Sequence, residues 1–68
     1  MYKITVYCMR GSELFNSLMD WIAFGEKKGK VHWYIEGNRD TGVAKFEFDM
    51  DNIEDYWVVK DYQRECAA

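Results

Sequence analysis

A chain of 68 residues with 49% hydrophobic and 18% aromatic residues is long enough for one small domain and too apolar for a disordered segment. The formal net charge is −3. Residues 1–46 carry seven Lys and Arg against five Asp and Glu, whereas residues 47–68 carry two against seven. This acidic final third disfavours general nucleic-acid binding there and suits a protein partner with a basic surface, although charge runs are usually solvated faces.

The first half of the chain shows a strand pattern followed by a helix pattern. Residues 2–9 alternate between two faces and are rich in β-branched and aromatic side chains. The even-numbered positions are expected to be buried, with Cys8 as a small core residue. Ser12 predicts an N-cap, and apolar residues at helical spacing predict a helix over residues 13–25. Phe24 lies off the apolar stripe, which leaves open whether it packs over the helix end or is exposed.

Two further strands are predicted as a hairpin. Residues 30–36 alternate with Trp33 and its apolar neighbours facing inward, and residues 37–42 are rich in turn formers. Residues 43–50 alternate without a fault: the even positions are apolar, and three of the odd positions are charged. Helices can therefore cover only one face of this strand. It is the predicted central strand of a sheet that is open to solvent on its other face.

A second helix is predicted after a capping pattern at residues 51–54 and is expected to end near Tyr62. Val58 and Val59 also suit a strand, so residues 56–62 are open to either interpretation. The helix is preferred because a strand there would leave too short a crossover connection. One domain is therefore expected over residues 1–62, with a loose tail over residues 63–68.

These elements predict an α+β fold with the order β-α-β-β-α. A right-handed crossover gives a three-stranded antiparallel sheet of order 1-3-2, with both helices on one face. The arrangement resembles a ferredoxin-like fold that lacks its last strand. The resemblance is one of architecture and implies nothing about function.

The open face and the acidic helix supply the candidate protein-binding residues. They combine aromatic and Met side chains, which are favoured in interfaces, with acidic ones: Tyr7, Met9, His32, Tyr34, Glu47, Asp49, Glu54, Asp55 and Asp61. The open edge of the first strand, where Lys3 is the only charge, suits a partner's strand or a second copy of the chain. A homodimer through this edge or through the open face is therefore a further expectation.

Nucleic-acid association is the alternative hypothesis. Tyr7, His32, Tyr34 and Lys45 on the open face could bind RNA, or the acidic third could mimic a nucleic acid. Glu47 would repel phosphate, and the aromatic motif of RNA-recognition domains is absent from the sequence. Nucleic acid is therefore the less favoured partner.

No catalytic, metal-binding or cofactor-binding pattern is found in the sequence. His32 is the sole histidine and lacks a nucleophile or an orienting partner, so the chain is not expected to be an enzyme. Residues 49–52 are similar to the start of a calcium loop, but Ile53 and Lys60 stand where ligands belong. The glycines lack the spacing of phosphate-binding loops, and no cofactor is expected.

Two features give an expected compartment. The cysteines, Cys8 and Cys66, form neither a disulfide framework nor a metal-ligand pattern. The sequence shows no signal-peptide pattern and no apolar stretch that could span a membrane. A reducing cytoplasm and no membrane partner are therefore expected.

Taken together, these patterns predict a small non-enzymatic protein-binding module, an inhibitor or adaptor that docks on a larger protein or complex. Very small acidic domains without a site of their own often have such roles. Antagonists of host or defence machinery encoded by bacteriophages or mobile elements share this general character.

Overall fold

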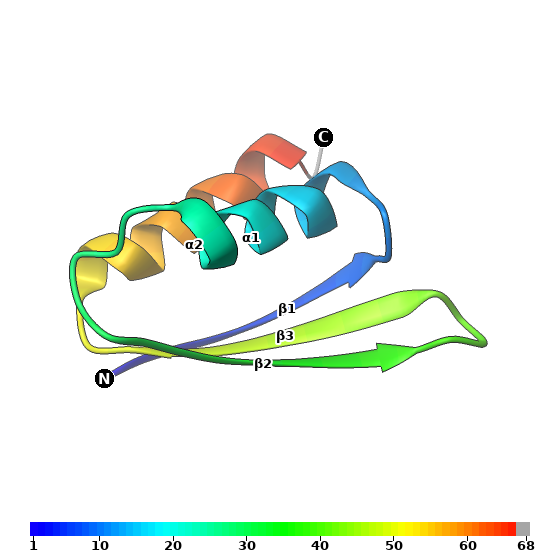
Figure 1. Ribbon diagram of the computed structural model, residues 1–68, viewed down its shortest axis with the longest axis horizontal. Coiled ribbons are helices and arrows are strands. Elements are labelled where there is room, and N and C mark those ends of the chain that lie inside the picture. The colour runs from blue at the N-terminus through cyan, green and yellow to red at the C-terminus, as the bar shows by residue number, and fades with distance from the viewer. Residues whose placement is uncertain (67–68) are drawn as a thin grey trace.

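The structure, a computed structural model, describes residues 1–66 and confirms the predicted α+β fold. Its elements are β1 (Tyr2–Met9), α1 (Glu13–Phe24), β2 (Val31–Asn38), β3 (Val43–Met50) and α2 (Ile53–Cys66). The strands form one antiparallel sheet of order β1-β3-β2, so β3 is the central strand as predicted. Both helices lie side by side on one face of the sheet (Figure 1).

Helix α1 begins and ends through local hydrogen bonds. Gly11, with φ of 81°, turns the chain out of β1, a conformation that L side chains rarely adopt. The Oγ of Ser12 then accepts a hydrogen bond from the backbone N–H of Phe15 at 3.2 Å, which confirms the predicted N-cap. The N–H of Gly25 donates to the carbonyl of Trp21 at 2.9 Å and closes the last turn. The helix therefore ends one residue earlier than predicted.

Helix α2 is longer than the sequence suggested. The Oδ1 of Asn52 accepts a hydrogen bond from the N–H of Glu54 at 2.8 Å at its start, and Arg64 lies in its last turn, where a cation suits the helix dipole. Residues 56–62 are helical. The loose tail predicted from residue 63 is wrong for residues 63–66, which belong to the helix. Residues 67–68 lie outside the described part of the chain.

The β2–β3 hairpin sets the register of the sheet. Its turn is closed by a hydrogen bond from the N–H of Gly42 to the carbonyl of Asn38 at 2.9 Å, and Gly42 has φ of 71°. Strand β2 starts one residue later and ends two residues later than predicted. The resulting register aligns Ile4, Phe48 and Trp33 across the three strands.

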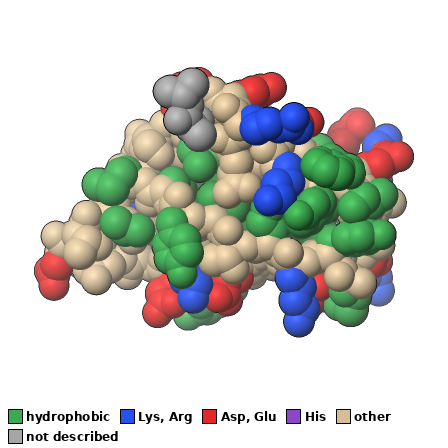
Figure 2. All heavy atoms as spheres, turned by 180° about the vertical axis from the view of Figure 1, so that it is seen from behind, with side chains coloured by type: hydrophobic (Ala, Val, Ile, Leu, Met, Phe, Trp, Pro, Cys, Tyr) green, Lys and Arg blue, Asp and Glu red, His purple; other side chains and the backbone are tan. Residues whose placement is uncertain are grey.

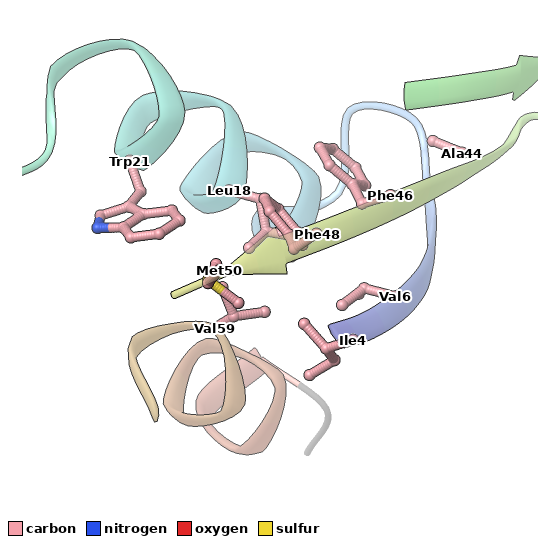
Figure 3. Packing of buried hydrophobic residues seen from close by; sticks show 9 residues of the cluster. All are labelled: Ile4, Val6, Leu18, Trp21, Ala44, Phe46, Phe48, Met50 and Val59. Carbon is pink, nitrogen blue, oxygen red and sulfur yellow. The ribbon is translucent and has the colours of Figure 1, made fainter. Parts of the chain in front are cut away.

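The core lies between the sheet and the helices (Figure 3), and β3 contributes most to it. All four even-numbered residues of β3 are buried, together with residues from the other elements: Ile4, Val6, Leu18, Trp21, Ala44, Phe46, Phe48, Met50 and Val59. The ring of Phe46 stacks on that of Phe48 at 5.9 Å between centroids, and Trp21 packs edge-on against Phe48 at 6.1 Å. Burial of each large side chain contributes about 1.5–3 kcal/mol.

The helix layer covers β1 and β3 but leaves β2 largely bare. The helices make their main contacts with β1 and β3, whereas β2 packs chiefly on β3. Trp33 lies on the helix side of the sheet as predicted, yet it is 50% exposed because no helix stands over it. Phe24 does not pack over the helix end and is 86% exposed. Cys8, expected in the core, is half-buried against the core's rim.

Candidate functional site

The open face of the sheet consists of rows of side chains that cross all three strands. Each row takes one residue from β1, one from β3 and one from β2: Lys3, Asp49 and His32, then Thr5, Glu47 and Tyr34, then Tyr7, Lys45 and Glu36. Met9 continues the β1 side of this face. Six of the candidate residues, from three separate strands, therefore share one surface: Tyr7, Met9, His32, Tyr34, Glu47 and Asp49.

Large apolar and aromatic side chains on this face are strongly exposed. Tyr7 is 65% exposed, Tyr34 58% and Met9 55%. The two tyrosines stand in adjacent rows on the two outer strands, so their rings flank the charged residues of β3. Such residues are enriched in protein interfaces and depleted from ordinary wet surfaces.

A shallow depression of about 480 Å³ lies between the first two rows of the open face. Its polar lining includes Lys3, His32 and Asp49. The Oδ1 atom of Asp49 is buried and has no hydrogen-bond partner among the described residues. A buried acceptor without a donor is unfavourable, and this oxygen is enclosed by the protein and does not face a bound molecule.

Lys45 and Glu47 on β3 pair with each other. Their charged groups are 2.9 Å apart, and both side chains are partly exposed. The hydrogen bond that Lys45 donates to Glu47, together with the negative charge of Glu47, raises the pKa of Lys45 above its usual value. Lys45 is therefore a cation already balanced by a neighbouring carboxylate, which weighs against its use as a phosphate-binding group.

The remaining candidates, Glu54, Asp55 and Asp61, lie on α2 and do not join the open face. Glu54 and Asp61 are exposed, and Asp61 forms an ion pair with Arg64. Asp55 is 1% exposed, and its two carboxylate oxygens accept hydrogen bonds from the backbone N–H groups of Lys28 at 2.8 Å and Gly29 at 3.0 Å. Its carboxylate therefore holds the α1–β2 connection in place and is not available to a partner.

Asp51 has a similar structural role, because it accepts a hydrogen bond from the backbone N–H of Lys30 at 2.8 Å. The acidic final third is thus divided among the open face, the α1–β2 connection and the exposed side of α2. The sequence did contain one signal for Asp55: it stands four residues before the buried Val59 and so shares its helical face. Charge-reversal tests of α2 should accordingly use Glu54 and Asp61 and leave Asp55 unchanged.

An aromatic surface beside β1 was not predicted. It consists of Tyr2, Lys3, Tyr56, Trp57 and Lys60, and is called the β1–α2 flank below. The ring of Tyr2 lies 6.0 Å from that of Tyr56, which lies 5.6 Å from that of Trp57. The Nζ of Lys60 lies 5.7 Å from the centre of the Tyr56 ring. Seen from behind, hydrophobic side chains gather at one end of the molecule beside Lys and Arg side chains (Figure 2).

The structure assembles no group of reactive side chains within residues 1–66. No cluster of three or more His, Cys, Asp and Glu side chains in this range is arranged to hold a metal ion. His32 faces Asp49 across the sheet, but forms neither a hydrogen bond nor an ion pair with any described residue. None of the helices in the described range is both long enough and apolar enough to cross a membrane.

Comparison with known protein families gave no match to this chain, and searches of curated proteins and of solved structures found no significant similarity.

Proposed function

We propose that this chain is a non-enzymatic protein-binding module that acts as an inhibitor or adaptor by docking its open sheet face on a larger protein. The observation that carries the proposal is the set of exposed aromatic and Met side chains on this face, Tyr7, Tyr34 and Met9, carried by the two outer strands of the sheet. The paired strands fix the backbone that carries these side chains, so little backbone entropy is lost when a partner covers them.

The chemistry of the face indicates what a partner would present. Exposed rings flank the charged groups of β3, and Glu36 and Glu47 add exposed carboxylates to this face. A partner surface with an apolar centre and N–H donors, such as Arg or Lys side chains, matches this pattern. The same requirement agrees with the net charge of −3 and with a partner that carries a basic surface. The chain would inhibit a partner whose basic surface is its functional site, such as a protein that binds nucleic acids or takes part in host defence.

The test is recovery of a partner by the tagged full chain from a lysate of its host, combined with a matched pair of variants. Tyr7→Ser with Tyr34→Ser removes the two rings of the open face. Phe24→Ser is the control, because Phe24 is 86% exposed but lies on α1, away from this face. A stoichiometric protein that is retained by the control and lost by the double variant would support the proposal.

Two outcomes would contradict it. A partner that binds the double variant as well as the unchanged chain would remove the open face from the proposal. Recovery of nucleic acid without a protein partner, with an affinity that falls steeply as salt is raised, would favour the nucleic-acid hypothesis. A solution mass of twice the chain mass, lost in the double variant, would indicate that the open face is a homodimer interface.

A further inference from the structure

The edge of β1 is an eight-residue strand with a free side. β1 pairs with β3 on one side, and no other strand within residues 1–66 pairs with it on the other. Every second residue of such a strand directs its backbone N–H and C=O groups outward, where they can bond to an additional strand. No proline, bulge or inward-pointing charge blocks this edge, because the only charged residue of β1 is Lys3.

Helix α2 lies over the β1 side of the sheet. The helix layer packs chiefly over β1 and β3 and leaves Trp33 of β2 half exposed. The ring of Tyr56 on α2 lies 6.0 Å from the ring of Tyr2 at the start of β1. These two rings therefore border the helix side of the space beside β1, where another strand would lie.

The charges around this space are positive. Tyr56 marks the side of α2 that faces the β1 edge, and the helical period places Lys60 and Gln63 on the same side. The three exposed acids of α2, Glu54, Asp61 and Glu65, fall on the opposite side of the helix. Neither Lys3 nor Lys60 forms an ion pair with any residue from 1 to 66.

We infer that the β1 edge binds an extended acidic segment of a partner protein whose helix-facing side chains are mainly apolar. Its backbone adds a fourth strand to the sheet. On the helix side its apolar side chains pack against Tyr2 and Tyr56 and one carboxylate meets Lys60, while on the open-face side its carboxylates meet Lys3. Backbone hydrogen bonds supply affinity in this mode of binding, and alternate side chains supply specificity. This site borders the open face, with which it shares Lys3, and extends the proposed function to the strand edge.

A second copy of the chain fits this edge less well. In an antiparallel pair of β1 strands the two Lys3 residues would lie at opposite ends of the interface. Neither β1 nor the edge side of α2 contributes an acid that could meet Lys3 or Lys60 of the other copy. A second copy therefore leaves these lysines without partners, whereas an acidic segment of a different protein supplies them.

The test is selection of random eight-residue displayed peptides on the immobilised full chain. The expected peptides carry Asp or Glu at every second position, and β-branched or aromatic residues with one further Asp or Glu at the positions between. A synthetic copy of the best peptide should shift the backbone amide resonances of residues 2–9 and the indole resonance of Trp57. Its affinity should fall about tenfold in the double variant Lys3→Gln with Lys60→Gln, and should weaken as salt is raised.

The matched control is Lys30→Gln with Arg39→Gln, which removes the same charge from exposed positions outside the flank and should leave binding unchanged. Three results would overturn the inference: selection of basic or uncharged peptides or of none, resonance shifts centred on His32 and Tyr34, or equal losses in both double variants. A dimeric solution mass with shifts at residues 2–9 would assign the edge to a second copy instead. Tyr34→Ser changes the open face on β2, away from the β1 edge, and should leave peptide binding intact, so this site and the open-face proposal can fail independently.

Discussion

Removal of the Asp55 carboxylate is expected to cause one of the largest losses of stability that a single polar residue of this chain can cause. The side chain is 1% exposed and accepts two backbone hydrogen bonds, from Lys28 at 2.8 Å and from Gly29 at 3.0 Å. A hydrogen bond to a charged group contributes about 1.5–3 kcal/mol. In the variant, water can reach the two N–H groups in part because they belong to an exposed loop. Asp55→Ala should therefore lower the free energy of unfolding by about 3 kcal/mol, the lower end of the range for two such bonds.

This loss is large relative to the total free energy of unfolding of the domain. A domain of this length is stable by about 3–10 kcal/mol, from about 0.05–0.15 kcal/mol per residue. Urea denaturation followed by tryptophan fluorescence measures the effect, and with a slope of about 1 kcal/mol/M the midpoint should fall by about 3 M or the chain should be unfolded in water. Asp55→Asn keeps one acceptor oxygen and should lose about half as much.

The control is Asp61→Ala, on the same helix but exposed, where the change should stay within about 0.5 kcal/mol. An Asp55→Ala midpoint no lower than that of the control would refute the assignment of Asp55 as the anchor of the α1–β2 connection. Asp55 would then not be needed for folding, and its charge would return it to the set of binding candidates.

Three other predictions concern the connection, the core and the half-buried thiol. A Cβ at Gly29 would overlap Asp51 Oδ1, so Gly29→Ala should break the hydrogen bond that Asp51 accepts. The free energy of unfolding should fall by about 1 kcal/mol, which lowers the melting temperature by several degrees. An unchanged melting temperature would contradict this. Phe48→Ala should cost about 3–5 kcal/mol in urea denaturation, whereas Phe24→Ala should cost almost nothing, and equal costs would contradict the packing described. Burial raises the pKa of the Cys8 thiol above its value in the unfolded chain. The stabilisation of the fold by the neutral thiol is therefore complete below the pKa of the unfolded chain and is lost as the pH rises through the pKa of the folded chain. Stability should therefore fall in alkaline solution, less steeply in Cys8→Ala, and iodoacetamide should alkylate Cys8 slowly in the folded chain.

The sheet could be predicted from the sequence because alternation determines which side of a strand is apolar. Residues 43–50 alternate over their full length, and the structure buries all four of their even positions. Trp33 shows the limit of this reasoning. Alternation places it correctly on the helix side, but whether a helix stands over it depends on where the helix layer sits across the sheet, and no local pattern contains that information.

The hydrogen bonds of Asp55 could not be predicted from the sequence, for a different reason. Its hydrogen-bond donors are backbone N–H groups 26 and 27 residues earlier in the chain, and every residue except proline has such a group. Side-chain types at Lys28 and Gly29 therefore give no hint of the contact. The β1–α2 flank was missed on similar grounds, because Tyr2 and Tyr56 meet only through the tertiary fold.

The two proposed surfaces are joined through β1 itself. Its odd-numbered side chains, Lys3, Thr5 and Tyr7, begin the cross-strand rows of the open face, while its outer backbone forms the free edge. A strand added at that edge would place alternate side chains of its own in line with these rows and would widen the open face by one residue per row. A partner that inserts an extended acidic segment could then cover Tyr7 with the structure next to that segment. Because such a partner binds only the folded chain, it would also stabilise a domain whose own core is small.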